Sequence, residues 1–213
     1  MMNEEKPTLS IAQGDDGKWR VDIDETIGMT EQDKFLYHAF GGGMGSDMET
    51  KPIVEGYFTE PASKGHHLAK AGGLVEHSVN VTRRLLALTD ALHVKWPRKE
   101  SPYLVGMFHD LVKCRCYRPV PCTEHLESPS WEYVQPEYPG HGACSVAIAA
   151  ELGIQLMREE IAAITFHMGP WGVGKEYSEQ EMRAAMKVFA PQIIATHTAD
   201  WYAAEVDERE VAS

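Results

Sequence analysis

The segment that decides the fold spans residues 72–88 and reads GGLVEHSVNVTRRLLAL. Its apolar positions recur at steps of three and four residues, and the stripe consists of Leu74, His77, Val81, Leu85 and Leu88. This spacing is typical of an amphipathic α-helix that buries one face. The segment therefore predicts a helix that carries one histidine, His77, on its buried face.

Helical patterns continue on the C-terminal side of this segment. The further predicted helices are 103–111, 143–152, 157–168, one that begins at the capping box of residues 178–181, and a last one that begins at Pro191. Between them, the proline-rich stretch 117–139 is expected to be an irregular insertion, long enough to act as a functional loop.

The N-terminal part has a different pattern. Residues 8–12 and 19–23 alternate between apolar and polar positions around a Gly-Asp-Asp-Gly turn at 14–17, which predicts a β-hairpin. A short helical stretch at 30–40 follows. We therefore expect an all-α protein with two parts: an N-terminal appendage over 1–58, whose hairpin is the only sheet, and a helical bundle over 59–213.

Composition and charge limit the classes of function. The chain has 20 Lys and Arg against 32 Asp and Glu, a net charge of −12. Proteins that coat duplex nucleic acid are usually basic, so that class is disfavoured. Because no apolar run reaches 18 residues and the charged N-terminus lacks a secretory signal, we expect a cytoplasmic protein without a membrane partner.

The four cysteines are expected to be reduced thiols rather than a disulfide framework. Three of them, Cys114, Cys116 and Cys122, lie within nine residues, and His125 follows. This group is either a separate zinc site or an ordinary reduced cluster, and its irregular spacing favours the ordinary cluster.

Four histidines and two aspartates lie on apolar faces or at the starts of different predicted helices. They are His77, His109, Asp110, His141, His167 and Asp200. Neutral imidazole and carboxylate groups are suitable ligands for zinc, iron or manganese. An ionised aspartate in a core is costly unless a cation pairs with it. Each residue alone is usually an ordinary core or surface group, but the set on successive helices predicts a metal site.

These residues resemble the HD-domain metal-dependent phosphohydrolase superfamily over about residues 66–204. The matching motifs are GGLVEHS at 72–78, FHDLVK at 108–113, GHG at 140–142, FHM at 166–168 and HTAD at 197–200. The resemblance implies that His77, His109, Asp110 and Asp200 hold a primary metal. It also implies that His141 and His167 hold a second ion, with Asp110 as the bridge. The expected cofactor is one or two divalent transition-metal ions: Mn, Ni, Zn or Fe.

The resemblance implies a phosphomonoesterase or phosphodiesterase that uses metal-activated water. The expected substrate is small and phosphorylated, a nucleotide or short oligonucleotide. Asp110 and Lys113 are then the catalytic candidates, since Lys113 follows Asp110 by one helical turn and its ammonium can reach a phosphate oxygen. Further substrate-binding candidates are Arg115, Arg118, His66 and His67. Trp131, Tyr133 and Tyr138 either stack on a nucleobase or pack the insertion, with packing favoured.

Two other functions remain open. Some oxygenases of the same superfamily use the same four histidines and two aspartates with two iron ions. The basic run of Lys113, Arg115 and Arg118 favours phosphate chemistry over that alternative. A non-catalytic ligand-sensing module is the third class, and the complete set of potential ligands argues against it.

Overall fold

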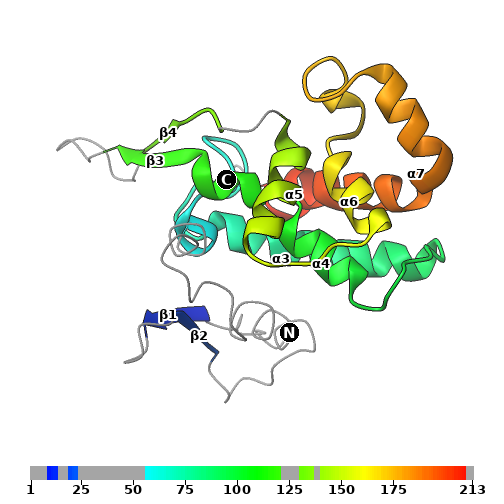
Figure 1. Ribbon diagram of the computed structural model, residues 1–213. Coiled ribbons are helices and arrows are strands. Elements are labelled where there is room, and N and C mark those ends of the chain that lie inside the picture. The colour runs from blue at the N-terminus through cyan, green and yellow to red at the C-terminus, as the bar shows by residue number, and fades with distance from the viewer. Residues whose placement is uncertain (1–8, 14–18, 24–55, 121–129, 137–139, 210–213) are drawn as a thin grey trace. The chain divides into compact units, whose positions relative to one another are not determined.

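The computed structural model describes residues 9–13, 19–23, 56–120, 130–136 and 140–209 (Figure 1). Contacts between backbone positions divide the chain into two units, residues 1–54 and 55–213. In the first unit, β1 (Leu9–Gln13) pairs with β2 (Trp19–Ile23) as an antiparallel ribbon in which Ile11 faces Val21. These strands cover the residues whose alternation predicts a hairpin. The helix predicted at 30–40 lies outside the described residues.

The second unit is mostly helical. Its α-helices are α3 (Gly73–Ala91), α4 (Ser101–Phe108), α5 (His141–Glu151), α6 (Arg158–Thr165) and α7 (Glu179–Tyr202). Shorter helical segments follow α4, α6 and α7: η1 (Leu111–Arg115), η2 (Gly169–Gly172) and the π-helical η3 (Ala203–Asp207). Helix α3 packs against α4 and α7, and α6 packs against α5 and α7 (Figure 1).

The predicted stripe of α3 forms part of the core. Leu74, Val81 and Leu85 are fully buried, and so is His77, whereas Leu88 near the end of the helix is half-buried. Burial of each such aliphatic side chain contributes about 2 kcal/mol to folding. This apolar stripe therefore fixes the face of α3, and with it the direction in which His77 points.

A close approach of α3 and α4 occurs at Gly106. A β-carbon at this position would lie 2.4 Å from Oγ1 and 2.7 Å from Cα of Thr82, so a larger residue would push the helices apart. The crossing brings two histidines of the site together, because the ring centroids of His77 and His109 are 5.3 Å apart.

A second sheet lies in the middle of the chain. Strand β3 (Tyr117–Val120) pairs antiparallel with β4 (Ser130–Tyr133), and Trp131 faces Pro119 in the register. The prediction that the N-terminal hairpin is the only sheet is therefore wrong, and part of the proline-rich insertion is a β-ribbon. Trp131 is buried, as a packing role requires, whereas Tyr133 is exposed. Tyr138 lies outside the described residues.

Helix α7 contains a break between its two predicted parts. The sequence indicates two helices, and the structure has two helical segments that meet at a kink at Phe189, where φ is −121° and ψ is 18°. Pro191 explains the kink, because its ring crowds the preceding turn and it lacks an N–H group. The predicted capping box is present: Glu181 N–H donates to Ser178 Oγ, and Ser178 N–H donates to the Glu181 carboxylate.

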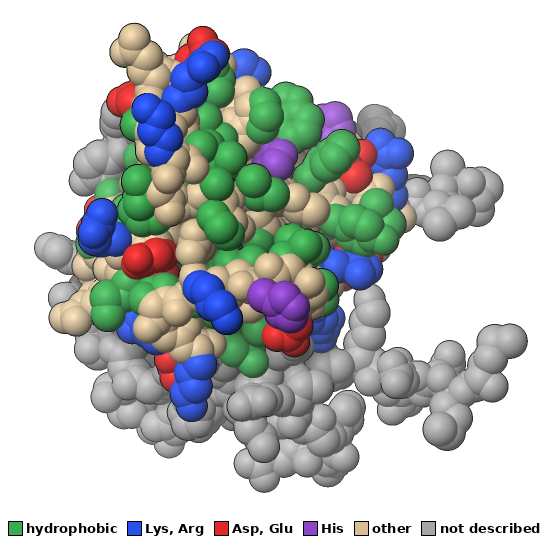
Figure 2. Space-filling view, turned by 90° about the vertical axis from the view of Figure 1, so that its right-hand side faces the viewer, with side chains coloured by type: hydrophobic (Ala, Val, Ile, Leu, Met, Phe, Trp, Pro, Cys, Tyr) green, Lys and Arg blue, Asp and Glu red, His purple; other side chains and the backbone are tan. Residues whose placement is uncertain are grey.

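The surface of the helical unit mixes apolar and charged side chains (Figure 2). The exposed large hydrophobic residues of α7 and η3 are Val188, Ile194, Trp201, Tyr202 and Val206. Among the helices that the structure describes, none has the length and apolar character needed to span a bilayer.

Candidate metal centre

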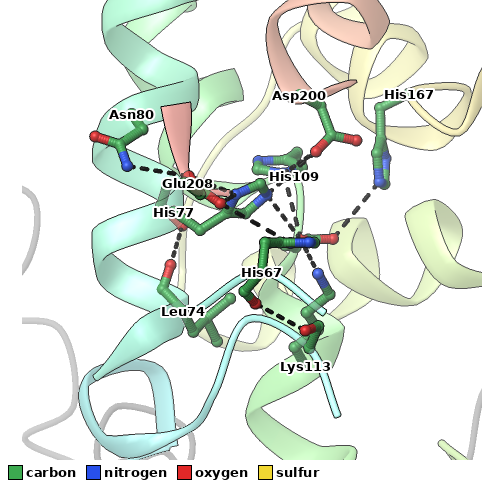
Figure 3. A network of polar contacts seen from close by, with 12 residues as sticks. His67, Leu74, His77, Asn80, His109, Lys113, His167, Asp200 and Glu208 are labelled. Atoms are coloured by element: carbon green, nitrogen blue, oxygen red, sulfur yellow. Dashed lines mark hydrogen bonds and ion pairs between the residues drawn. The ribbon is translucent and has the colours of Figure 1, made fainter. Parts of the chain in front are cut away.

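The six potential ligands lie together at one place in the helical unit, although they come from five different elements. Figure 3 shows four of them, His77, His109, His167 and Asp200, pointing toward one another. His77 lies on α3, the His109-Asp110 pair follows α4, His141 begins α5, His167 follows α6, and Asp200 lies near the end of α7. The prediction of a buried cluster of histidine and aspartate is confirmed.

Each of three buried histidines donates from Nδ1 to an oxygen that only accepts. The Nδ1 of His109 lies 2.9 Å from the carbonyl of Gly106, and that of His167 lies 2.7 Å from the carbonyl of Ile164. The Nδ1 of His77 lies 3.0 and 2.9 Å from the two carboxylate oxygens of Glu208. Because these oxygens cannot donate, the hydrogen of each neutral ring is on Nδ1, and each Nε2 keeps its lone pair.

The three Nε2 atoms point into a space that is rich in acceptors. They are buried and make no hydrogen bond within the described residues. The Nε2 atoms of His77 and His109 lie 3.6 and 3.4 Å from Oδ2 of Asp110, and that of His167 lies 3.6 Å from Oδ1. Buried acceptors without a partner are costly. A cation among them removes that cost, so the donor set fits a metal ion.

Asp110 belongs to two of the ligand groups. Its Oδ2 faces His77 and His109, and its Oδ1 faces His167 and His141, whose Nε2 donates to it at 2.6 Å. The atoms of each group lie within 4.8 Å of one another, as do those of a third group that includes Asp200. One carboxylate with histidine pairs at both oxygens has the arrangement needed to bridge two ions.

The electrostatics of the site keep both aspartates ionised. Burial alone would raise the pKa of Asp110, but Lys113, His109 and His141 hold that pKa well below its usual value. The pKa of Asp200 is likewise lowered, since the His77 ring, whose Nε2 lies 3.1 Å from Oδ1, and the charge of His109 outweigh its burial. Burial disfavours a charged His77, yet Asp200 and Glu208 raise its pKa to about 9, so a metal ion that binds this ring displaces a proton from Nε2. The carboxylates therefore attract positive charge to this position.

Lys113 lies beside Asp110, as the spacing predicts. Its Nζ is 2.6 Å from Oδ2 of Asp110, within the 3₁₀ turn η1, and the side chain is only 14% exposed. Burial lowers the pKa of the ammonium group, but Asp110 raises it further, so the net pKa is above the ordinary value. Lys113 therefore carries a positive charge next to the cluster.

The N-terminus of α5 is held against the end of α6 by a second close approach. A β-carbon on Gly142 would lie 2.3 Å from the carbonyl oxygen of Ile164 and 2.4 Å from that of Thr165. Only glycine fits this contact without a shift of the helices. The contact places the rings of His141 and His167 at a centroid distance of 5.4 Å.

A cavity of about 220 Å³ opens onto the cluster. Its walls contain His67, Asp110, Lys113, His141, Met168, Trp171, His197, Asp200, Trp201 and Ala204. His67 is thus the member of the predicted His66/His67 pair that reaches the site, and its ring centroid is 5.0 Å from that of His77. His66 is exposed and does not contribute to the walls.

The other basic candidates lie elsewhere on the unit. Arg115 pairs with Glu151 at 2.6 Å, and Arg118 is exposed on β3. Neither contributes to the walls of the cavity. Their predicted role in substrate binding therefore receives no support from their positions.

The sequence reasoning missed several residues of the site. Glu208 lies in an acidic C-terminal stretch that has the composition of a solvated surface segment, so nothing in its surroundings indicates burial. A signal did exist for two tryptophans of the cavity wall, because Trp201 directly follows Asp200 and Trp171 follows His167 by one helical turn.

The cysteines stand apart from the cluster. Cys114, Cys116 and Cys144 are buried, reduced thiols, whereas Cys122 and His125 lie outside the described residues. Among the residues that the structure does describe, no group able to hold a metal includes a cysteine. Burial raises the pKa of the Cys114 and Cys116 thiols, which keeps them protonated.

Comparison of the chain with protein-family models, with curated proteins and with solved structures finds no match.

Proposed function

We propose that this protein is a metal-dependent phosphohydrolase of the HD-domain type, which hydrolyses a small phosphoester. One observation carries the proposal: three buried Nε2 atoms without hydrogen-bond partners converge on two ionised aspartates. Such a donor set suits a divalent transition metal. The order of the ligands along the chain is that of the superfamily which the sequence resembles.

The roles of the residues follow from their positions. His77, His109, Asp110 and Asp200 would hold a first ion, and Asp110, His141 and His167 a second. A divalent ion in this place supplies Lewis acidity and lowers the pKa of a bound water. Asp110 orients the two halves of the site, because its two oxygens face different histidines.

Lys113 gives the site its preference for an anion. Among the described residues of the cavity wall, it is the only Lys or Arg. Its ammonium can offset the negative charge of a phosphate group that enters the cavity. The chain as a whole has a net charge of −12, so a long polyanion would be repelled, whereas a small phosphoester needs only the cavity.

The test measures metal content and phosphate release on one preparation. Protein is stripped with a chelator, reloaded with Mn, Ni, Zn or Fe, and assayed against a panel of small phosphoesters. We expect tight binding of a transition metal and release of phosphate that is lost in Asp110→Asn. The matched control is Asp90→Asn, because Asp90 is an exposed aspartate on α3 and does not contribute to the cavity wall.

Two results would overturn the proposal. The first is the absence of metal binding at saturating metal in the wild-type protein. The second is metal binding without hydrolysis of any phosphoester, together with oxygen uptake in the iron-loaded protein when an organic substrate is added. That second result would assign the site to an oxygenase.

A further inference from the structure

Two tryptophans on the cavity wall are largely exposed to solvent. Trp171, on η2, is 52% exposed and Trp201, on α7, is 54% exposed. Their ring centroids are 5.5 Å apart with an angle of 52° between the planes. Two large indole groups in contact with each other and with water form an apolar surface beside an ionic cluster.

His197 connects Trp171 with the backbone beside the cluster. Its Nδ1 lies 2.8 Å from the carbonyl oxygen of His167, so the N–H donates to the backbone next to the cluster. Its ring lies 5.0 Å from that of Trp171. His197 is one helical turn before Trp201 on α7, and the two side chains therefore share one face of the helix. Trp171 and Trp201, which we call the aromatic wall, thus lie beside the backbone segment that carries His167.

The lining of the cavity combines two chemically different sets of side chains. Asp110, Asp200 and Lys113 are ionic, whereas Trp171, Trp201, Met168 and Ala204 are apolar. Aromatic side chains of this kind stack on planar rings, which contributes about 1–3 kcal/mol per ring. A volume of about 220 Å³ is below the usual range for ligand sites, so the cavity suits one ring and one phosphate rather than a longer chain.

We propose that Trp171 and Trp201 form a subsite for a planar aromatic ring, and that this ring belongs to the phosphoester whose phosphate binds beside Lys113 in the same cavity. The ring is that of a nucleobase or of an aryl group. This inference rests on the proposed phosphohydrolase function for the position of the phosphate. The stacking surface itself depends only on the two indole groups.

The experiment compares three ligands that share a phosphate. They are adenosine 5′-monophosphate, 1-naphthyl phosphate and ribose 5-phosphate, of which the last has no aromatic ring. Binding is measured by the quenching of tryptophan fluorescence and by calorimetry on the metal-loaded protein, and phosphate release is measured in parallel. We expect the ring-bearing ligands to bind at least tenfold more tightly than ribose 5-phosphate, and the tighter of the two identifies the source of the ring.

Variants of Trp171 and Trp201 separate the loss of stacking from a loss of phosphate binding or of metal binding. Trp201→Leu and Trp171→Leu are expected to weaken the ring-bearing ligands about 10-fold to 100-fold and to leave ribose 5-phosphate and metal content unchanged. Trp201→Phe retains a ring and is expected to recover most of the affinity. Ile194→Ala is the control, because Ile194 is an exposed apolar residue of the same helix outside the cavity.

The outcomes distinguish the two proposals. Equal binding of all three ligands by the wild-type protein, or no loss of affinity in the two leucine variants, would overturn the aromatic subsite. Quenching by the ring-bearing ligands without release of phosphate from any of the three esters or from the panel of small phosphoesters would retain the subsite and overturn the proposed hydrolysis. If ribose 5-phosphate and the ring-bearing esters are hydrolysed with equal kcat/KM, the hydrolase is retained and the subsite is rejected.

Discussion

The imidazole of His77 donates to the carboxylate of Glu208, a residue 131 positions later in the chain, with Nδ1–oxygen distances of 3.0 and 2.9 Å. Asn80 donates to the same carboxylate at 3.0 Å. The segment after α7 therefore folds back on α3 and orients His77, a potential metal ligand, through the ring nitrogen that faces away from the cluster (Figure 3). The carboxylate fixes both the ring plane and the tautomer, which leaves Nε2 free to face the cluster.

Removal of this support is expected to weaken metal binding. In Glu208→Ala the ring of His77 loses its acceptor, and we expect the metal affinity to fall about 10-fold to 100-fold. Glu208→Gln keeps an acceptor oxygen and is expected to lose less. Competition with a chromogenic chelator measures the affinity. Glu205→Gln, at an exposed glutamate that pairs with Arg209, is the matched control, and equal affinities in Glu208→Ala and this control would contradict the role.

The number of ions per chain tests the bridge at Asp110. We expect two ions per wild-type chain at saturating metal. Asp110→Asn removes a negative charge from both ligand groups and is expected to lose both ions, whereas His141→Ala is expected to lose one. Elemental analysis after gel filtration gives the count. If the wild-type protein and His141→Ala both bind a single ion, the site is mononuclear and His141 faces the substrate.

The contact at Gly142 is a test of how the site is assembled. Gly142→Ala places a methyl group 2.3 Å from the carbonyl of Ile164, so α5 and α6 must separate. Overpacking of this kind costs about 1–3 kcal/mol of unfolding free energy. Urea denaturation measures the loss. Gly65→Ala is the control, because its β-carbon would meet nothing within 4 Å, and an equal effect of the two substitutions would contradict the packing argument.

An ion pair between half-buried Arg98 and buried Glu160, away from the cluster, gives a dependence of stability on pH. Glu160 accepts from Arg98 at 2.8 and 2.7 Å and from Ser101 at 2.7 Å. Burial would raise the pKa of Glu160, but the bonds from Arg98, Met157 and Ser101 lower it below the ordinary value of 4.5. The folded-state pKa is depressed, so this contribution to stability is complete above pH 4.5 and is lost as pH falls through the folded-state value.

Arg98→Ala leaves the Glu160 carboxylate buried without its cation. We expect a loss of about 3 kcal/mol of unfolding free energy at pH 7. The difference in unfolding free energy between Arg98→Ala and the wild-type protein is expected to become smaller at acidic pH, because a protonated, neutral Glu160 is no longer stabilised by the charge of the guanidinium. Urea denaturation at both pH values tests this. Arg183→Ala, which breaks an exposed pair with Glu179, is the control and is expected to cost under about 1 kcal/mol at either pH.

The sequence predicts those features of the fold that depend on local periodicity, such as which face of a helix is buried. The stripe of α3 shows that His77 is buried, and the apolar run before His109 and Asp110 shows that this pair is buried as well. Strands β3 and β4 escape prediction because each has four residues and β3 contains Pro119, so no alternation can be recognised. Glu208 escapes it because its burial depends on tertiary contacts with His77 and Asn80, which no local pattern reveals.

The contact between Lys113 and Asp110 has a consequence for the order of events during maturation. The ammonium group touches Oδ2 and the ring of His141 touches Oδ1, so the carboxylate is compensated by the chain itself. Small zinc domains lack such internal compensation and stay unfolded until the ion arrives. Here the internal cations allow the polypeptide to complete its tertiary structure first, so any metal ion that the cluster binds is taken up by the finished protein.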